Sequence, residues 1–180
     1  MHYVFLAGIG NSGEGHWQRL WYEQRSESAS WVEHADWDNP VMETWLANLE
    51  ATVAQVEEDI VVVAHSLGCV LLTEWLKRHH HPSLAAALLV AIPDTQGSEF
   101  PPQAKHFSNL DHPIKKPCPM VVVASDDDPY GSVEHAKEQA SALNAEFRLI
   151  GKVGHINASS GLGDWPEGKQ VLKNLLEKCV

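Results

Sequence analysis

The chain has 180 residues, a length that fits one domain over residues 1–180. Hydrophobic residues make up 44% of the chain and charged residues 21%, which is ordinary for a soluble protein with a buried core. The formal net charge of −11 argues against nucleic acid and against an anionic membrane surface as partners, because both bind clusters of Lys and Arg.

The three cysteines, Cys69, Cys118 and Cys179, show no metal-type spacing such as C-x-x-C. A reducing cytoplasm is the simplest interpretation of this usage. The first residues lack the basic start of a signal peptide, and no apolar run approaches the roughly 20 residues of a membrane span. We therefore expect a cytoplasmic protein that needs no membrane, no metal and no cofactor.

Short apolar runs alternate with helical patterns along the whole chain. The predicted strands cover residues 3–7, 31–34, 60–64, 84–92, 120–124 and 146–150. The predicted helices lie between them and cover 16–25, a segment from 39–40 onward, 67–79 and 133–143, and a last helix starts at about 164. A Gly-rich turn over 8–15 follows the first strand, and an irregular excursion over 93–119 follows the fourth.

Two of the predicted helices carry a start pattern as well as an apolar face. Asn39-Pro40 combines a capping residue with proline at the first helical position. Asp164 and Glu167 form a capping-box pattern before the last helix. The apolar positions recur at spacings of three and four and are Val41, Trp45, Leu49, Val53 and Val56 in the first helix and Val171, Leu172, Leu175 and Leu176 in the second.

Strands that alternate with helices predict a parallel sheet covered on both faces, a three-layer α/β/α sandwich of about six strands. Active sites in such sheets lie at the carboxyl ends of the strands. This rule selects the four turns that follow Ala7, Ala64, Ala124 and Ile150.

The turn after Ala64 reads Ala64-His65-Ser66-Leu67-Gly68, and it joins a predicted strand to a predicted helix. A strand, x-x-Ser-x-Gly and a helix form the nucleophile-elbow arrangement, with Ala64 where glycine is usual. We therefore predict Ser66 as a nucleophile, although a serine here could also simply cap the helix.

The turn after Ala124 contains three adjacent acids, Asp126, Asp127 and Asp128. In this arrangement an acid follows the serine along the chain and a histidine follows the acid. Asp128 is preferred, because the following Pro129 biases its backbone away from helical angles. The alternative is that all three are solvated turn residues.

The turn after Ile150 contains His155, which a flexible loop beside Gly154 could bring to Ser66. The other ring nitrogen of His155 would then donate to Asp128. A histidine in a loop is usually only a surface residue, but the chain order Ser, Asp, His favours a catalytic role for His155.

The Gly-rich turn after Ala7 lets the backbone approach a ligand closely. We predict the N–H groups of Ile9 and Leu67 as oxyanion donors, with Gly10 as the next choice on the first loop. A phosphate cradle is the weaker alternative for this turn: residues 8–13 read G-x-G-x-x-G, a weak signal when it stands alone, and G-x-x-x-x-G-K-[ST] cannot be written here.

Further residues are predicted near the substrate. These are Gly10, Asn11, Trp17 and Tyr130. Trp21, Trp37 and Trp165 lie near the same loops, and the tryptophans could either line an acyl pocket or pack helices onto the sheet.

Five segments together resemble the retinoblastoma-binding protein 9 family of small serine hydrolases. They are GIGNSGEGHWQRLW, ADWDNPVMETWLANL, VVVAHSLGCVLLTEWL, SDDDPYGSVEHAKEQA and VGHINASSGLGDWPEG, and the resemblance extends over residues 3–168. It implies an α/β-hydrolase fold without a large lid, and a triad at Ser66, Asp128 and His155. The family's retinoblastoma-type partner is not expected, because no L-x-C-x-E segment occurs in the chain.

The sequence therefore predicts a serine hydrolase that acts on small carboxylester or thioester substrates through an acyl-enzyme. The alternative is a protein that keeps the fold but not the chemistry and serves as a binding or interaction module.

Overall fold

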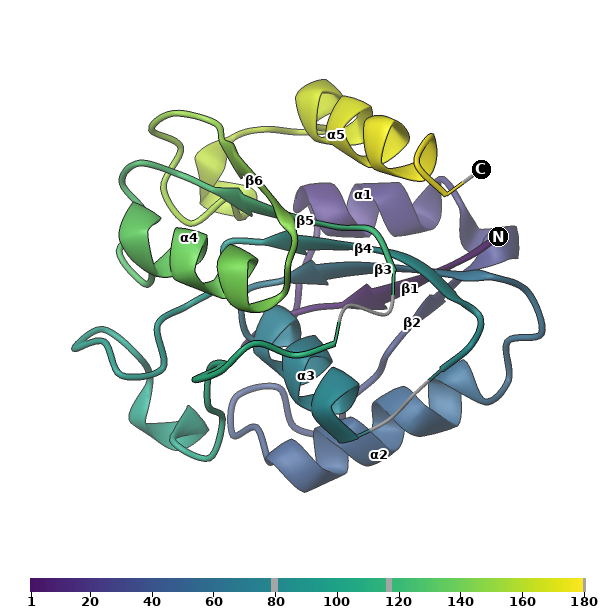
Figure 1. Cartoon of the computed structure of the whole chain (residues 1–180), viewed down its shortest axis with the longest axis horizontal. Coiled ribbons are helices and arrows are strands. Elements are labelled where there is room, and N and C mark those ends of the chain that lie inside the picture. The colour runs from purple at the N-terminus through teal and green to yellow at the C-terminus, as the bar shows by residue number, and fades with distance from the viewer. Residues whose placement is uncertain (79–80, 116–117, 180) are drawn as a thin grey trace.

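A computed structural model describes residues 1–78, 81–115 and 118–179. Within these ranges six strands form one parallel sheet in the order β2-β1-β3-β4-β5-β6 (Figure 1). The strands are β1 (His2–Leu6), β2 (Ala29–Trp31), β3 (Ile60–His65), β4 (Leu84–Val90), β5 (Met120–Ala124) and β6 (Glu146–Leu149). The predicted α/β-hydrolase architecture is confirmed.

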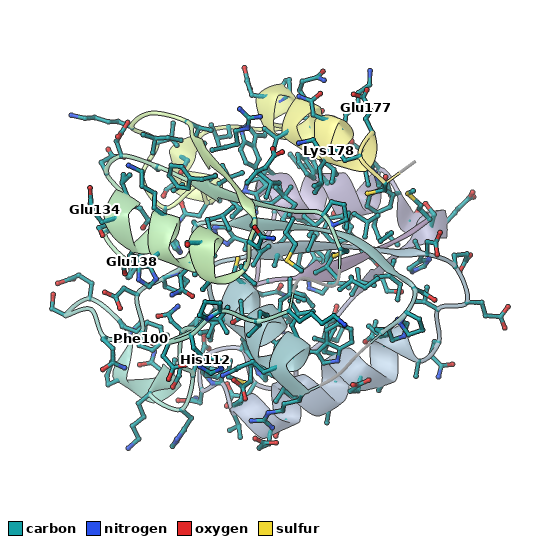
Figure 2. All side chains as sticks on the ribbon, viewed as in Figure 1. Phe100, His112, Glu134, Glu138, Glu177 and Lys178 are labelled. Carbon is teal, nitrogen blue, oxygen red and sulfur yellow. The ribbon has the colours of Figure 1, made fainter. Side chains whose placement is uncertain are left out.

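Helices cover both faces of the sheet (Figure 1). One face carries α1 (Trp17–Glu23) and α5 (Pro166–Leu176), and the other carries α2 (Met42–Val53), α3 (Leu67–Arg78) and α4 (Val133–Ala142). Charged side chains such as Glu134 and Glu138 of α4 lie on the outer surface of the helix layer, and Lys178 is exposed just beyond α5 (Figure 2).

The central strands are apolar at every position except His65 at the end of β3, because each of their faces is buried. In β3, Val62 and Ala64 contribute to the core under α2, α3 and α4, whereas Val61 and Val63 contribute to the core under α1 and α5. Successive side chains of a strand point to opposite faces, so a strand between two helix layers needs apolar residues at odd and even positions alike.

Two predicted boundaries in the first third of the chain are wrong. The helix expected from Asn39-Pro40 begins only at Met42, because Asn39 belongs to a turn in which its N–H donates to the Asp36 carboxylate at 2.8 Å. The short strand expected over 31–34 is β2, which begins two residues earlier, at Ala29, and ends at Trp31.

The predicted capping box of the last helix is also wrong. Trp165 precedes the helix in a left-handed conformation with φ of 45°, and no side chain caps the helix. The Asp164 carboxylate instead accepts hydrogen bonds from Gln24 and Lys169. The apolar face is as expected, with Leu172 and Leu175 buried.

The long irregular excursion after β4 is confirmed, since the described residues between 93 and 119 contain one short 3-10 turn, Pro102–Ala104, as their only helix. The helix predicted to end at residue 79 is α3, which ends at Arg78, and residue 79 itself lies outside the described residues. No helix in the described ranges combines the length and the apolar character needed to cross a membrane.

Candidate active site

Ser66 lies in the turn that joins β3 directly to α3. Its backbone is left-handed, with φ of 54°, an unusual conformation for a residue with a side chain. The Ser66 N–H donates to the carbonyl of Val90 on the neighbouring strand at 2.9 Å. Gly68 makes the turn possible, because a Cβ there would lie 2.3 Å from the Leu6 carbonyl oxygen. The tight turn leaves the Ser66 side chain at the wall of a pocket.

The structure brings Ser66, His155 and Asp128 together. His155 Nε2 lies 2.8 Å from Ser66 Oγ, and His155 Nδ1 lies 2.9 Å from both carboxylate oxygens of Asp128. The side chain of His155 is 10% exposed and that of Asp128 is 3% exposed. When Nδ1–H donates to the carboxylate, a neutral imidazole keeps Nε2 free to accept from the serine hydroxyl.

The three adjacent acids occupy different positions. Asp127 Oδ1 accepts from the Gly154 N–H at 2.8 Å and from the Ser125 hydroxyl at 2.9 Å, and these donors lower the pKa of its carboxyl group. Asp126 is exposed. Asp128 is the acid that contacts the imidazole, and its Oδ1 also accepts from the Tyr130 N–H at 2.9 Å.

The loop after β1 lies directly against the serine turn. A Cβ on Gly8 would lie 2.8 Å from Ser66 Cβ and 3.3 Å from the Leu67 nitrogen. Ile9 and Leu67 both line the pocket, and in the described part of the chain neither N–H donates a hydrogen bond. As the first residue of α3, Leu67 has an N–H with no partner inside its helix.

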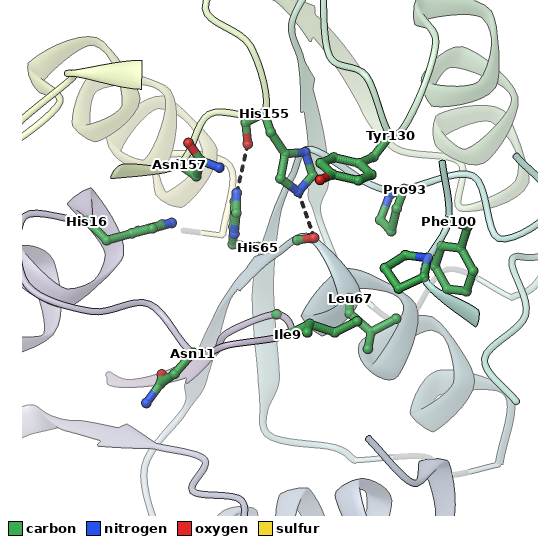
Figure 3. Close-up of a pocket in the computed structure, with 13 residues that line it drawn as sticks. Ile9, Asn11, His16, His65, Leu67, Pro93, Phe100, Tyr130, His155 and Asn157 are labelled. Atoms are coloured by element: carbon green, nitrogen blue, oxygen red, sulfur yellow. Dashed lines mark hydrogen bonds between the residues drawn. The ribbon is translucent and has the colours of Figure 1, made fainter. Parts of the chain in front are cut away.

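A pocket of about 250 Å³ opens beside Ser66. One side of it is mainly apolar and carries Pro93, Phe100 and Tyr130, and the other side carries His16 and Asn157 (Figure 3). The excursion after β4 and the loops after β1, β5 and β6 all contribute to its wall, as expected for a site at the carboxyl ends of parallel strands.

Two of the four residues predicted near the substrate lie in this pocket. Asn11 and Tyr130 line it, whereas Gly10 and Trp17 do not. The Trp17 indole is 1% exposed, because α1 packs it onto the sheet, and its Nε1–H donates to the Ile156 carbonyl at 2.8 Å. The expected substrate contact of Trp17 is thus replaced by a contact with the histidine loop. Trp21, Trp37 and Trp165 also lie outside the pocket wall.

The sequence reasoning missed several residues of the pocket wall. Phe100 and Pro101 belong to the excursion after β4, which also begins at the carboxyl end of a strand, so the same rule is the signal that points to them. His65 also lines the pocket, and its Nε2 lies 3.0 Å from the His155 carbonyl oxygen. No local pattern marks His16 or Asn157.

The pocket wall carries little charge. Among the described residues, no Lys, Arg, Asp or Glu lines it. Burial, with a smaller effect of the neighbouring His155, lowers the pKa of His16 to about 4, and burial lowers the pKa of His65 well below its usual value. Both imidazoles are therefore neutral near pH 7. In the described ranges no three His, Cys, Asp or Glu side chains gather closely enough to hold a metal ion.

Comparisons with known proteins match almost the whole chain. A family model described as "serine hydrolase" matches residues 3–174. Among solved structures, one described as a YdeN-like hydrolase from Pectobacterium atrosepticum is 23% identical, with a TM-score of 0.86 over 99% of this chain and 92% of the other.

Two further structures extend the comparison. The ydeN gene product of B. subtilis is 22% identical, with a TM-score of 0.73 over 98% of this chain and 100% of the other. The type II thioesterase BorB from the borrelidin biosynthetic cluster is 14% identical, with a TM-score of 0.67 over 97% and 92% of the two chains. No curated protein sequence matches the chain.

Proposed function

Since the chain belongs to the serine hydrolase family, we propose that it hydrolyses small, uncharged ester-like substrates through an acyl-enzyme on Ser66. One observation carries the proposal, namely the unbroken line of contacts from Ser66 Oγ through the imidazole of His155 to the Asp128 carboxylate. Each contact is 2.8 or 2.9 Å, within the reach that proton transfer from a nucleophile to a base requires.

The proposed reaction has two halves. In the first, Ser66 Oγ bonds to the substrate carbonyl carbon while its proton passes to His155 Nε2, and the same proton then leaves with the departing alcohol. In the second half a water molecule takes the place of the alcohol, gives its proton to His155 Nε2 and releases the carboxylic acid, and Ser66 regains its proton. Asp128 stabilises the imidazolium that forms in each half.

The oxyanion of each tetrahedral intermediate needs donors that are already in position. Ile9 and Leu67 both line the pocket beside Ser66, so we assign their N–H groups as these donors, and the start of α3 adds the positive end of a helix dipole. Gly8 supports this arrangement, because it lets the loop after β1 lie against the turn of Ser66 without a side chain between them.

The pocket limits the size and charge of the acyl group. A volume of about 250 Å³ corresponds to about eight water-sized groups. The wall of Phe100, Pro93 and Tyr130 suits an apolar chain or ring, and the uncharged wall offers no ion-pair partner for a charged one. We infer a preference for short, uncharged acyl groups.

A fluorophosphonate probe tests the nucleophile. We expect it to label the wild-type protein and to leave Ser66→Ala unlabelled, because the phosphorus bonds to the serine oxygen. On a series of p-nitrophenyl esters of increasing chain length, kcat/KM should fall steeply once the acyl group exceeds about eight non-hydrogen atoms. Ser66→Ala should lose at least about 10⁴-fold in kcat. Equal labelling of both proteins would exclude Ser66 as the nucleophile.

Thioesters remain candidates for the same site, and the fold shared with the BorB thioesterase is compatible with them. The matched comparison is one acyl group presented as an oxygen ester and as a thioester. We also propose a kinship with the retinoblastoma-binding protein 9 family, on the five sequence segments, and a cytoplasmic location, on the cysteine usage. A protein that bound acyl ligands without labelling or turnover would instead be the non-catalytic module.

A further inference from the structure

The loop that carries His155 has little regular structure of its own. It follows β6, and its only helical piece in the described chain is the 3-10 turn Ala158–Ser160. Gly154 and Ile156, the residues on either side of His155, are both left-handed, with φ of 63° and 50°. A β-branched residue such as Ile156 is strained in this region, so the conformation must be held by contacts from outside the loop.

Two side chains from other elements hold the peptide groups on either side of the strained residue. His65 Nε2 lies 3.0 Å from the carbonyl oxygen of His155 (Figure 3), and Trp17 Nε1–H donates to the carbonyl of Ile156 at 2.8 Å. His65 ends β3, and Trp17 begins α1. The two donors thus fix both peptide groups that flank the Ile156 Cα.

Both donors are themselves fixed by tight aromatic packing. Trp17 is 1% exposed and packs edge to face against both Trp21 and Trp165, with ring centroids 4.7 and 4.9 Å away. The rings of His16 and His65 meet edge to face at 4.7 Å. Burial keeps His65 neutral, so one ring nitrogen carries a hydrogen for the His155 carbonyl.

We propose that His65 and Trp17 are positioning residues that hold the backbone of the general base, so that His155 Nε2 stays within reach of Ser66. The proposal rests on the proposed function of His155. Its strongest support is the position of His65, which precedes Ser66 in the chain and bonds to the backbone of His155. The turn that presents the nucleophile therefore also holds the backbone of the general base through His65.

The chain provides a matched control for this proposal. Trp21 lies on the same helix as Trp17, is equally buried, and its Nε1–H also donates to a backbone carbonyl at 2.8 Å. The acceptor is Asp164, nine residues beyond His155 in the chain. Trp17→Phe and Trp21→Phe thus remove the same N–H and a similar volume from one aromatic cluster, but only the first touches the residues next to the base.

The experiment compares Trp17→Phe, His65→Phe and Trp21→Phe by steady-state kinetics, thermal unfolding and hydrogen exchange. We expect Trp17→Phe and His65→Phe to lower kcat about 10- to 100-fold with little change in KM, because a small misplacement of a catalytic group is costly. Amide exchange in the segment 153–158 should rise in both. Trp21→Phe should keep kcat within about twofold of the wild-type value, even if its melting temperature falls as much as that of Trp17→Phe.

Several results would overturn the proposal. One is a wild-type kcat together with unchanged exchange at 153–158 in Trp17→Phe and His65→Phe. Another is an equal loss of kcat in Trp21→Phe, which would indicate a general loss of packing. If Trp17→Phe does not fold, 3-benzothienylalanine at position 17 removes the N–H while keeping the shape. If the wild type neither hydrolyses esters nor takes up the fluorophosphonate, the proposed function fails, and hydrogen exchange still decides whether the two bonds hold the loop.

Discussion

The two halves of the candidate active site are built in different ways. The turn of Ser66 is held by backbone: its N–H donates to the carbonyl of Val90, and the backbone of β1 passes so close that Gly68 has no space for a Cβ. The loop of His155 is held largely by side chains. Asp127, His65 and Trp17 bond to three successive residues, 154, 155 and 156.

The difference explains what each half can tolerate. A turn held by neighbouring strands depends on small residues at a few positions close together in the sequence. A loop held by side chains depends on residues that lie 27 to 139 positions away along the chain. Substitutions that remove a single distant donor should therefore affect the histidine half, whereas added volume should affect the serine half.

Among the changes that compare the two halves, the largest effect is expected at Asp128, which contacts the imidazole of the histidine half. Asp128→Asn keeps the shape of the side chain but presents an amide to His155 Nδ1, which favours the wrong tautomer of the imidazole. We expect kcat to fall about 10³- to 10⁴-fold with little change in KM. Initial rates on a p-nitrophenyl ester, measured under saturating conditions, test this prediction.

The two neighbouring acids are the controls for Asp128. Asp127→Asn retains the Oδ1 that accepts from Gly154 and Ser125, so it should keep most of the activity, and the exposed Asp126→Asn should match the wild type. Full activity in Asp128→Asn, or a larger loss in either neighbour, would assign the acid to another carboxylate.

The serine half should respond most to added volume at Gly8. In Gly8→Ala the new methyl group would overlap Ser66 Cβ at 2.8 Å, and it would crowd the Leu67 nitrogen. We expect a loss of about 10²- to 10³-fold in kcat, the usual effect of disturbing one oxyanion donor. Gly13→Ala is the matched control on the same loop, because the space around its Cβ is open and its φ is not positive. Equal rates for the two variants would mean that the loop moves aside without cost.

The sequence predicted the sheet well, for a reason visible in its central strands. An apolar, β-branched run such as Val61–Val63 is long enough to be a strand and is apolar on both faces, so it indicates a buried parallel strand. Helix starts were predicted less well. Asn39 and Asp164 are suitable capping residues, but neither caps a helix. Asn39 belongs to a turn closed by Asp36, and Asp164 bonds to Gln24 while the left-handed Trp165 stands directly before α5.

The sequence also predicted which three side chains would meet, because each follows a strand at the same edge of the sheet. It could not predict what surrounds them. The choice between pocket wall and interior for Trp17 depends on the packing of α1 against α5, and the place of Phe100 depends on the path of an irregular excursion. Neither is encoded in a local pattern, since both result from contacts between distant segments.

The free energy of unfolding should depend on pH, and this dependence offers a further comparison of the two halves. Burial lowers the pKa of His16 and of His34 to about 4 in the folded protein, from an ordinary value of 6.5. Between these two pH values the unfolded chain binds more protons than the folded one, so the free energy of unfolding falls as the pH falls. The stability linked to each neutral, buried imidazole is fully present above pH 6.5 and is lost by about pH 4. For His16 it amounts to at most about 3 kcal/mol.

Urea unfolding at pH 7, 6, 5 and 4 measures this slope, and single variants divide it between the two regions. His16 touches His65 and so supports the histidine loop, whereas His34 stacks on Trp45 of α2, away from the site. Both His16→Gln and His34→Gln should flatten the slope, and the exposed His106→Gln should not. At pH 4, relative to pH 7, the wild type should also lose more amide protection at 153–158 than at the serine turn, because protonation of His16 would disturb its contact with His65, which holds the His155 carbonyl. An equal loss in both segments would mean that acid weakens the whole fold rather than the half held by side chains.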